Sequence, residues 1–151
     1  MRRKEKNQLI MTDFFNELVN VRLDMKQRVE RRLKTIIGID ITYEMLQVLR
    51  VLWNSGGKIN QQEIANIVNK NKASLTSLID NLTKRGLVER TEDDADRRNK
   101  IIVLTKLGKA YQDKLQPTLS GIYDIEKSGI SIDEIASATA LLKALRCGTT
   151  R

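Results

Sequence analysis

The chain has 151 residues, of which 40% are apolar and 30% charged, with one proline and eight glycines. This composition is typical of one globular domain and excludes collagen-like and broadly disordered chains. No apolar run approaches the roughly 20 residues that span a bilayer, and no signal-peptide core follows the N-terminus, so we expect a soluble, cytoplasmic protein without a membrane partner. The single cysteine excludes an intramolecular disulfide, and the absence of histidine excludes Ser-His-Asp triads and histidine metal sites. We therefore expect no enzyme activity, no cofactor and no metal.

The net charge of +8 is concentrated in two segments. Residues 1–34 hold 10 basic and 5 acidic side chains, residues 60–110 hold 10 and 7, and the remaining segments are balanced. Clustered positive charge favours a polyanionic partner, because neutralising phosphates releases condensed counterions. A solvated lysine-rich surface has the same composition, so charge alone leaves both interpretations open.

A long amphipathic helix is predicted over residues 8–37. Its apolar residues recur at steps of three or four, which places them in one stripe, and Gly38 is a suitable C-terminal cap. A helix of this length measures about 45 Å, more than one small domain needs. The stripe consists of Phe14, Leu18, Val21, Met25, Val29, Leu33 and Ile36.

Three shorter helices follow. The first is predicted over 42–53 and ends at Ser55-Gly56-Gly57. Asn60, with Glu63 three residues later, resembles a capping box and begins a helix that runs to about Val68. After a turn at 69–71, another helix runs from Asn71 to Arg85 and ends at Gly86. The last two helices have the spacing of a helix-turn-helix, in which the second helix enters the major groove of DNA.

The helix over 71–85 divides into two faces. Leu75, Leu78, Ile79 and Leu82 share one face, which we expect to pack inward. The opposite face carries small and polar residues, namely Ala73, Ser77, Asp80 and Lys84, flanked by Ser74, Thr76 and Asn81. Small hydroxyl residues let a helix approach bases closely, and its N-terminal amides, helped by Lys72, can bind a phosphate. An ordinary surface helix has similar residues, and the acidic Asp80 argues slightly against DNA binding by this helix.

A β-hairpin is predicted after this helix. Residues 87–90 and 100–104 are rich in branched side chains, and the polar segment 91–99 joins them. A hairpin after a helix-turn-helix forms a wing. Among its charged residues, one arginine of Arg97-Arg98 can pair with an aspartate while the other reaches a narrow minor groove. A solvated charged turn is the alternative interpretation.

Two C-terminal helices complete the chain. Thr105 is suited to cap a helix that extends to about Ile125, with a kink at Pro117. Ser131 and Glu134 form a capping box before the last helix. The apolar periodicity rests on Leu107, Tyr111, Leu115, Leu119, Ile122 and Ile125 in the first of these helices, and on Ile132, Ile135, Thr139, Leu142 and Leu145 in the second.

Three segments together resemble the MarR (multiple antibiotic resistance regulator) family: 82–90 (LTKRGLVER), 93–98 (DDADRR) and 104–108 (LTKLG). The resemblance implies a mainly α fold with a small β-wing, a winged helix-turn-helix flanked by long N- and C-terminal dimerisation helices. The implied regions are 1–37 for the first dimerisation helix, 38–104 for the DNA-binding region and 105–151 for the C-terminal dimerisation helices, all in one compact unit. It also implies a homodimer that binds palindromic double-stranded DNA.

The DNA-facing residues follow by position. In the family the wing aspartate pairs with the arginine two residues later, which here implies Asp96 supporting Arg98 and leaves Arg97 for the minor groove. Ser77 stands where the family often has arginine, so no base preference is carried over. The full set expected at DNA is Asn71, Lys72, Ser74, Thr76, Ser77, Lys84, Arg97 and Arg98.

Many family members bind small aromatic acids or phenols between the dimerisation helices and the winged helix. Tyr43, Trp53 and Tyr111 are the candidates for lining such a crevice, although aromatic residues on apolar faces usually belong to the core. Some relatives sense oxidants through a cysteine in the first helix, where this chain has none. Cys147 lies near the C-terminus, where a spare surface thiol or a dimer-facing thiol is the simpler interpretation.

We therefore predict a dimeric DNA-binding transcriptional regulator, a repressor of nearby genes that a small ligand releases. The alternative is a winged-helix adaptor that binds protein instead of DNA, which the acidic wing residues favour mildly. An enzyme would need a base, a nucleophile or a carboxylate cluster that the sequence does not provide. The operator, the regulated genes and the effector are not encoded in any recognisable motif.

Overall fold

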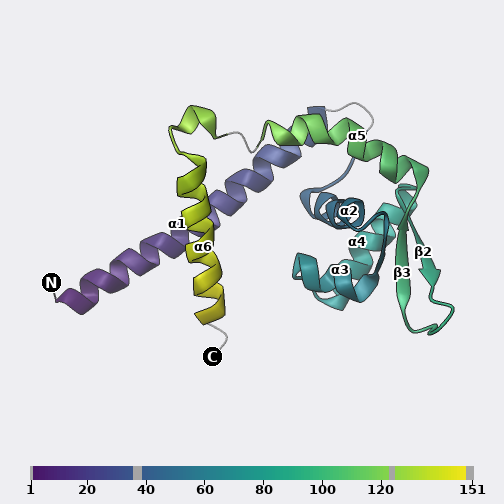
Figure 1. Cartoon of the computed structure of the whole chain (residues 1–151), viewed down its shortest axis with the longest axis horizontal. Helices are drawn as coiled ribbons and strands as arrows, with labels where there is room; N and C mark the ends of the chain where they lie inside the picture. The colour runs from purple at the N-terminus through teal and green to yellow at the C-terminus, as the bar shows by residue number, and fades with distance from the viewer. Residues whose placement is uncertain (1, 36–38, 123–124, 149–151) are drawn as a thin grey trace. The chain divides into compact units, whose positions relative to one another are not determined.

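The computed structural model describes residues 2–35, 39–122 and 125–148 (Figure 1). The described elements are α1 (Arg3–Thr35), α2 (Tyr43–Asn54), β1 (Lys58–Asn60), α3 (Gln61–Val68), α4 (Lys72–Lys84), β2 (Val88–Glu92), β3 (Lys100–Leu104), α5 (Lys106–Ser120), the 3-10 turn η1 (Glu126–Ser128) and α6 (Ile132–Gly148). The chain divides into two units, Met1–Leu119 and Ser120–Arg151. Among the described residues, no helix combines the length and apolar character that crossing a bilayer requires. The predicted fold class, mainly α with a small β-wing, is confirmed.

The strands form an antiparallel sheet in the order β1-β3-β2. Val88 lies opposite Leu104 and Asn60 opposite Ile101. Strand β2 extends to Glu92, two residues into the segment predicted as a loop, because those residues pair with β3. Strand β1 was not predicted, since its three residues are too few for an alternating pattern to be recognised.

The core of the first unit lies where α2, α3 and α4 meet the sheet. Leu75, Ile79 and Leu82 of α4 are buried as predicted, whereas Leu78 is only half-buried. Other fully buried side chains are Leu46, Leu49, Leu52, Ile64, Leu87, Ile102 and Leu115. Burial of these residues orients α4, because its apolar face cannot turn outward without exposing them to water.

Side chains cap most helix starts, as predicted at Thr105 and Ser131, whereas the cap at Asn71 was not predicted. Asn71 Oδ1 accepts from the Ser74 amide at 2.8 Å, and Thr105 Oγ1 accepts from the Gly108 amide at 3.1 Å. The Ser131–Glu134 capping box is confirmed in both directions, at 2.8 and 3.2 Å. The Ser131 amide and hydroxyl both donate to Glu134 Oε2 and hold the pKa of Glu134 below its ordinary value. Asn60 is the N-cap of α3, as predicted, but its bond is not that of a capping box with Glu63. There Asn60 Oδ1 accepts from the Gln62 amide at 2.7 Å, one residue before Glu63.

The C-terminal part of α1 packs against the rest of the unit and is joined to α2 by an ion pair. Val29 and Leu33 are buried, and Lys26 Nζ lies 2.8 Å from Glu44 Oε1. Partial burial raises the pKa of Glu44, but the hydrogen bond and charge of Lys26 outweigh this effect and hold it below the ordinary value. Since a depressed carboxylate pKa stabilises the fold only while the group is ionised, this contribution is present at neutral pH and is lost as the pH falls through that pKa.

Two predicted helix boundaries differ from the structure. Helix α1 begins at Arg3, earlier than predicted, and the expected positions of Ile36 and Gly38 lie outside the described residues. Helix α5 ends at Ser120 and not at Ile125. Pro117 lies in its last turns and cannot donate a helical hydrogen bond, and a turn follows at Gly121.

The start of α5 is held against the strands. The Thr105 hydroxyl donates to the Gly86 carbonyl at 2.6 Å, and Trp53 Nε1 donates to the Gly108 carbonyl at 3.0 Å. A Cβ added at Gly108 would meet the Leu87 carbonyl oxygen and come within 2.8 Å of a Leu104 methyl group. The glycine of the 104–108 segment (LTKLG) is therefore required by packing, because only a residue without a side chain lets α5 approach Leu87 and Leu104 this closely.

We predict that Gly108→Ala destabilises the protein, although alanine ordinarily stabilises a helix interior by about 1 kcal/mol relative to glycine. The collision with Leu87 backbone should lower the free energy of unfolding by about 1–3 kcal/mol, as overpacked cores do. Denaturant unfolding followed by circular dichroism measures the change. Gly148→Ala is the matched control, because a Cβ there meets nothing within 4 Å. Equal unfolding midpoints for the two variants would contradict the packing argument.

Candidate nucleic-acid interface

The helix-turn-helix is formed by α3, the turn 69–71 and α4. Asn69 has a φ of 54°, a left-handed conformation that asparagine tolerates, and the Lys70 amide donates to the Ala65 carbonyl at 3.0 Å. Asn71 then caps α4 with its side-chain oxygen. The turn therefore reverses the chain in a few residues and presents the N-terminus of α4 at the surface.

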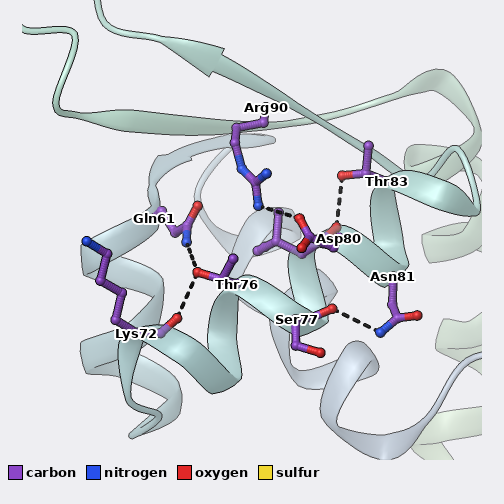
Figure 2. A network of polar contacts seen from close by, with 9 residues as sticks. Gln61, Lys72, Thr76, Ser77, Asp80, Asn81, Thr83 and Arg90 are labelled. Carbon is purple, nitrogen blue, oxygen red and sulfur yellow. Dashed lines mark hydrogen bonds and ion pairs between the residues drawn. The ribbon is translucent and has the colours of Figure 1, made fainter.

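The predicted residues of α4 do not share one environment. Lys72, Ser74, Ser77 and Lys84 are exposed, as a groove-facing helix requires. Thr76 is half-buried, and its hydroxyl donates to the Lys72 carbonyl at 2.8 Å. Figure 2 shows this hydroxyl within a network of contacts, while the Ser77 side chain takes no part in one.

Asp80, which argued against DNA binding in the sequence, is paired with the wing. Its Oδ1 lies 2.9 Å from Arg90 Nη2, so the ion pair joins α4 to β2 (Figure 2). The pair neutralises a carboxylate on the polar face of α4 and reduces its repulsion of an approaching phosphate. Sequence reasoning missed this contact because the two residues are adjacent only through the packing of β2 on α4.

The wing loop uses its carboxylates internally. Asp93 Oδ1 accepts from the Ala95 amide and Asp96 Oδ1 from the Arg98 amide, each at 3.0 Å. The second bond corrects the expected side-chain pairing: Asp96 binds the backbone of Arg98, and no ion pair to its guanidinium is found among the described residues. Arg97 and Arg98 are both exposed. At the base of the loop Lys100 Nζ lies 3.0 Å from Glu92 Oε1.

A cavity of about 470 Å³ lies between the helix-turn-helix and the wing. Its lining includes Gln61 and Thr76, and its basic side chains are Lys72, Arg90, Arg98 and Lys100. No acidic residue is among those that line it in the described part of the chain. The cavity joins the start of α4 to the wing through a positively charged surface, which is the charge that a phosphate backbone requires.

The three aromatic candidates do not line one common cavity. Tyr43 lines a second cavity of about 470 Å³, together with Arg22, Arg50 and Lys70, and neither Trp53 nor Tyr111 contributes to it. Trp53 is committed to the Gly108 carbonyl. Cys147 is an exposed free thiol near the end of α6.

A helix-turn-helix followed by a two-stranded wing defines the chain as a winged-helix protein. Residues 41–100, which contain this region, match the model of the MarR family. The chain is 35% identical to the HTH-type transcriptional regulator SarZ of Staphylococcus haemolyticus over 97 residues, 63% of each chain. It is 27% identical to the multiple antibiotic resistance protein MarR of Salmonella typhimurium over 139 residues, 89% of this chain and 96% of that protein. The winged-helix region of the chain thus matches the MarR family, and its relatives include a protein named as a transcriptional regulator.

Solved structures share the fold. The structure of reduced AbfR bound to DNA has a TM-score of 0.84 and 23% identity, covering 98% of this chain and 99% of that one. The organohalide-sensing regulator RdhR-CbdbA1625, solved in its 2,4-dichlorophenol-bound form, has a TM-score of 0.81 and 18% identity, covering 93% and 81%.

The backbone bond in the wing leads to a prediction. Asp96→Ala removes the acceptor and should speed hydrogen exchange of the Arg98 amide about fivefold, the equivalent of a hydrogen bond of about 1 kcal/mol. Arg98→Ala keeps its amide and should leave the loop protected. Hydrogen exchange followed by NMR measures both. Asp94→Ala is the control, as Asp94 is an exposed aspartate of the same loop. Faster exchange at neighbouring amides in Arg98→Ala would show that the guanidinium stabilises the loop after all.

Proposed function

We propose that the chain is a homodimeric repressor that binds a palindromic operator through α4 and the wing and releases it when a small aromatic acid or phenol binds. One observation carries the proposal: the exposed, asparagine-capped start of α4 lies beside a cavity whose charged side chains are all basic. The match to the MarR family and a structural neighbour described as DNA-bound support it.

The residues divide into two roles at DNA. Ser74 and Ser77 have exposed hydroxyls that can reach base edges, whereas Lys72 and Lys84 are suited to phosphates. Asn71 can donate its side-chain amide to a phosphate while its oxygen caps α4. In the wing, Arg98 lines the basic cavity and is suited to a phosphate, which leaves Arg97 for the minor groove.

The proposed dimer rests on apolar surface that the single chain leaves uncovered. On α1 the exposed side chains are Leu9, Ile10, Met11, Phe15, Val19, Val21 and Leu23. On α6 they include Ile132, which is 72% exposed, Ile135 and Leu141. Exposed apolar residues spread over two helices are typical of an interface, and a second copy that buries them accounts for both.

The proposed effector site is the cavity lined by Tyr43. Its volume suits a small molecule. Arg22, Arg50 and Lys70 line it with one acidic residue, Glu44, which is paired with Lys26, so positive charge is in excess for a carboxylate or phenolate beside the Tyr43 ring. The dichlorophenol in a structural neighbour supports a ligand of this class. Because Leu78 of α4 also lines the cavity, a ligand bound there can shift the DNA-facing helix.

The alternative function, a winged-helix adaptor that binds protein, is less well supported. The acidic wing residues were its main argument, and Asp93 and Asp96 accept hydrogen bonds from the loop's own amides while Glu92 pairs with Lys100. These groups are committed to shaping the wing and do not form a free acidic surface.

We predict that Ser77→Ala and Lys72→Ala impair DNA binding in different ways. Ser77→Ala should relax discrimination at particular base positions by about 1–3 kcal/mol. Lys72→Ala should weaken binding to all sequences equally and reduce the salt slope by about one unit. Selection from a random DNA pool followed by titrations at two salt concentrations measures both effects.

Lys114→Ala provides the control, as Lys114 is an exposed lysine of α5 outside the proposed interface. The selected sequence should be an inverted repeat with half-site centres about 10 base pairs apart. A wild-type protein that selects no sequence from the pool would refute the proposed function. A consensus altered by Lys72→Ala and left unchanged by Ser77→Ala would refute the residue roles alone.

We also predict a stable dimer whose interface buries on the order of 2,000 Å² or more. Val21→Asp and Leu142→Asp should dissociate it and abolish operator binding, because a buried unpaired charge is strongly unfavourable. Sedimentation equilibrium at micromolar concentration measures the change. Ile67→Asp on α3 is the matched control for dimerisation alone, because Ile67 lies in the helix-turn-helix; Ile67 is 61% exposed and Val21 is 58% exposed. A folded wild-type monomer at that concentration would contradict the prediction.

A further inference from the structure

Gln61, the first residue of α3, forms a polar bridge to α4. Its Nε2 donates to Thr76 Oγ1 at 3.1 Å, and the same hydroxyl donates to the Lys72 carbonyl at 2.8 Å (Figure 2). The Thr76 hydroxyl has only one proton, so it is committed as a donor inside the protein and receives a bond from a neighbouring helix. The bridge therefore connects the start of α3 to the first turns of α4.

The other end of the Gln61 amide has no such partner. Its Oε1 is buried and accepts no hydrogen bond from the described residues. The side chain also lines the basic cavity of about 470 Å³, so it is open on one side and is not enclosed by close packing. With one amide atom unpartnered and a cavity beside it, the Thr76 contact is the bond that fixes the orientation of this side chain.

We propose that Gln61 is a positioning residue that sets the angle of α4 against α3 through the Thr76 hydroxyl. The inference rests on the proposed DNA binding and assigns Thr76 a role beyond direct contact with bases. Ser74 and Ser77 are exposed residues of α4, so a small rotation of this helix would move both away from the bases that they are proposed to contact. A loss at Gln61 should then reduce sequence discrimination, although its own oxygen is inaccessible to DNA.

The test is a double-mutant cycle in which each variant is assayed for sequence discrimination. Discrimination is measured as the ratio of the affinity for the selected operator to the affinity for a scrambled duplex. Gln61→Met and Thr76→Val remove the bond with little change in shape, and each should lower the ratio about two- to tenfold. The double variant should lose no more than the larger single loss, because both substitutions break one contact. The salt slope should stay constant, because no phosphate contact changes.

Two further variants separate positioning from general destabilisation. Thr76→Ser keeps the hydroxyl and should retain wild-type discrimination. Gln116→Met is the matched control, because Gln116 is an exposed glutamine of α5 that does not line the basic cavity. Thermal unfolding of every variant checks that the fold is intact. If Gln61→Met does not fold, the comparison of Thr76→Val with Thr76→Ser decides the question.

The outcomes are distinguishable. Additive losses, unchanged discrimination in Gln61→Met and Thr76→Val, or an equal loss in Gln116→Met would overturn the positioning role while wild-type DNA binding stands. A wild-type protein that does not discriminate between the two duplexes refutes the proposed function, and the inference with it.

Discussion

The burial of Leu75, Ile79 and Leu82 is the constraint on which the rest of the interface depends. These side chains occupy one face of α4, so their contact with the core determines which residues the helix presents outward. The same orientation brings Thr76 against α3 and Asp80 against β2. Removing apolar surface from water therefore has a directional consequence, although the hydrophobic effect itself is not directional.

Polar contacts within the protein then decide which side chains remain free for a partner. Asp80, Glu92, Asp93 and Asp96 are each bound to another group of the protein. The exposed lysines and arginines near the start of α4 and in the wing outnumber the acidic groups left available. These commitments leave Lys72, Arg97 and Arg98 as exposed cations with no ion pair among the described residues, and the proposed DNA binding relies on them.

The two terminal helices show that the single chain is incomplete as a packing unit. Only Val29 and Leu33 of α1 are buried, while most of its apolar side chains are exposed, and α6 has no buried residue. The winged helix, by contrast, has a buried apolar core of its own. This asymmetry separates the region that the proposed dimer would cover from the region that the proposed operator would contact.

The sequence alone was sufficient for the order of the helices and of the wing strands, the helix caps at Thr105 and Ser131, and the resemblance to the MarR family, because these depend on periodicity and on contacts within a few residues. The Asp80–Arg90 pair, strand β1 and the Gln61–Thr76 bond required the tertiary structure, because each joins residues that only packing brings together. The wing shows the limit most clearly. The family resemblance implied that Asp96 and Arg98 interact, but the side chain and the backbone amide of Arg98 belong to the same residue, so only the folded loop decided which group the carboxylate binds.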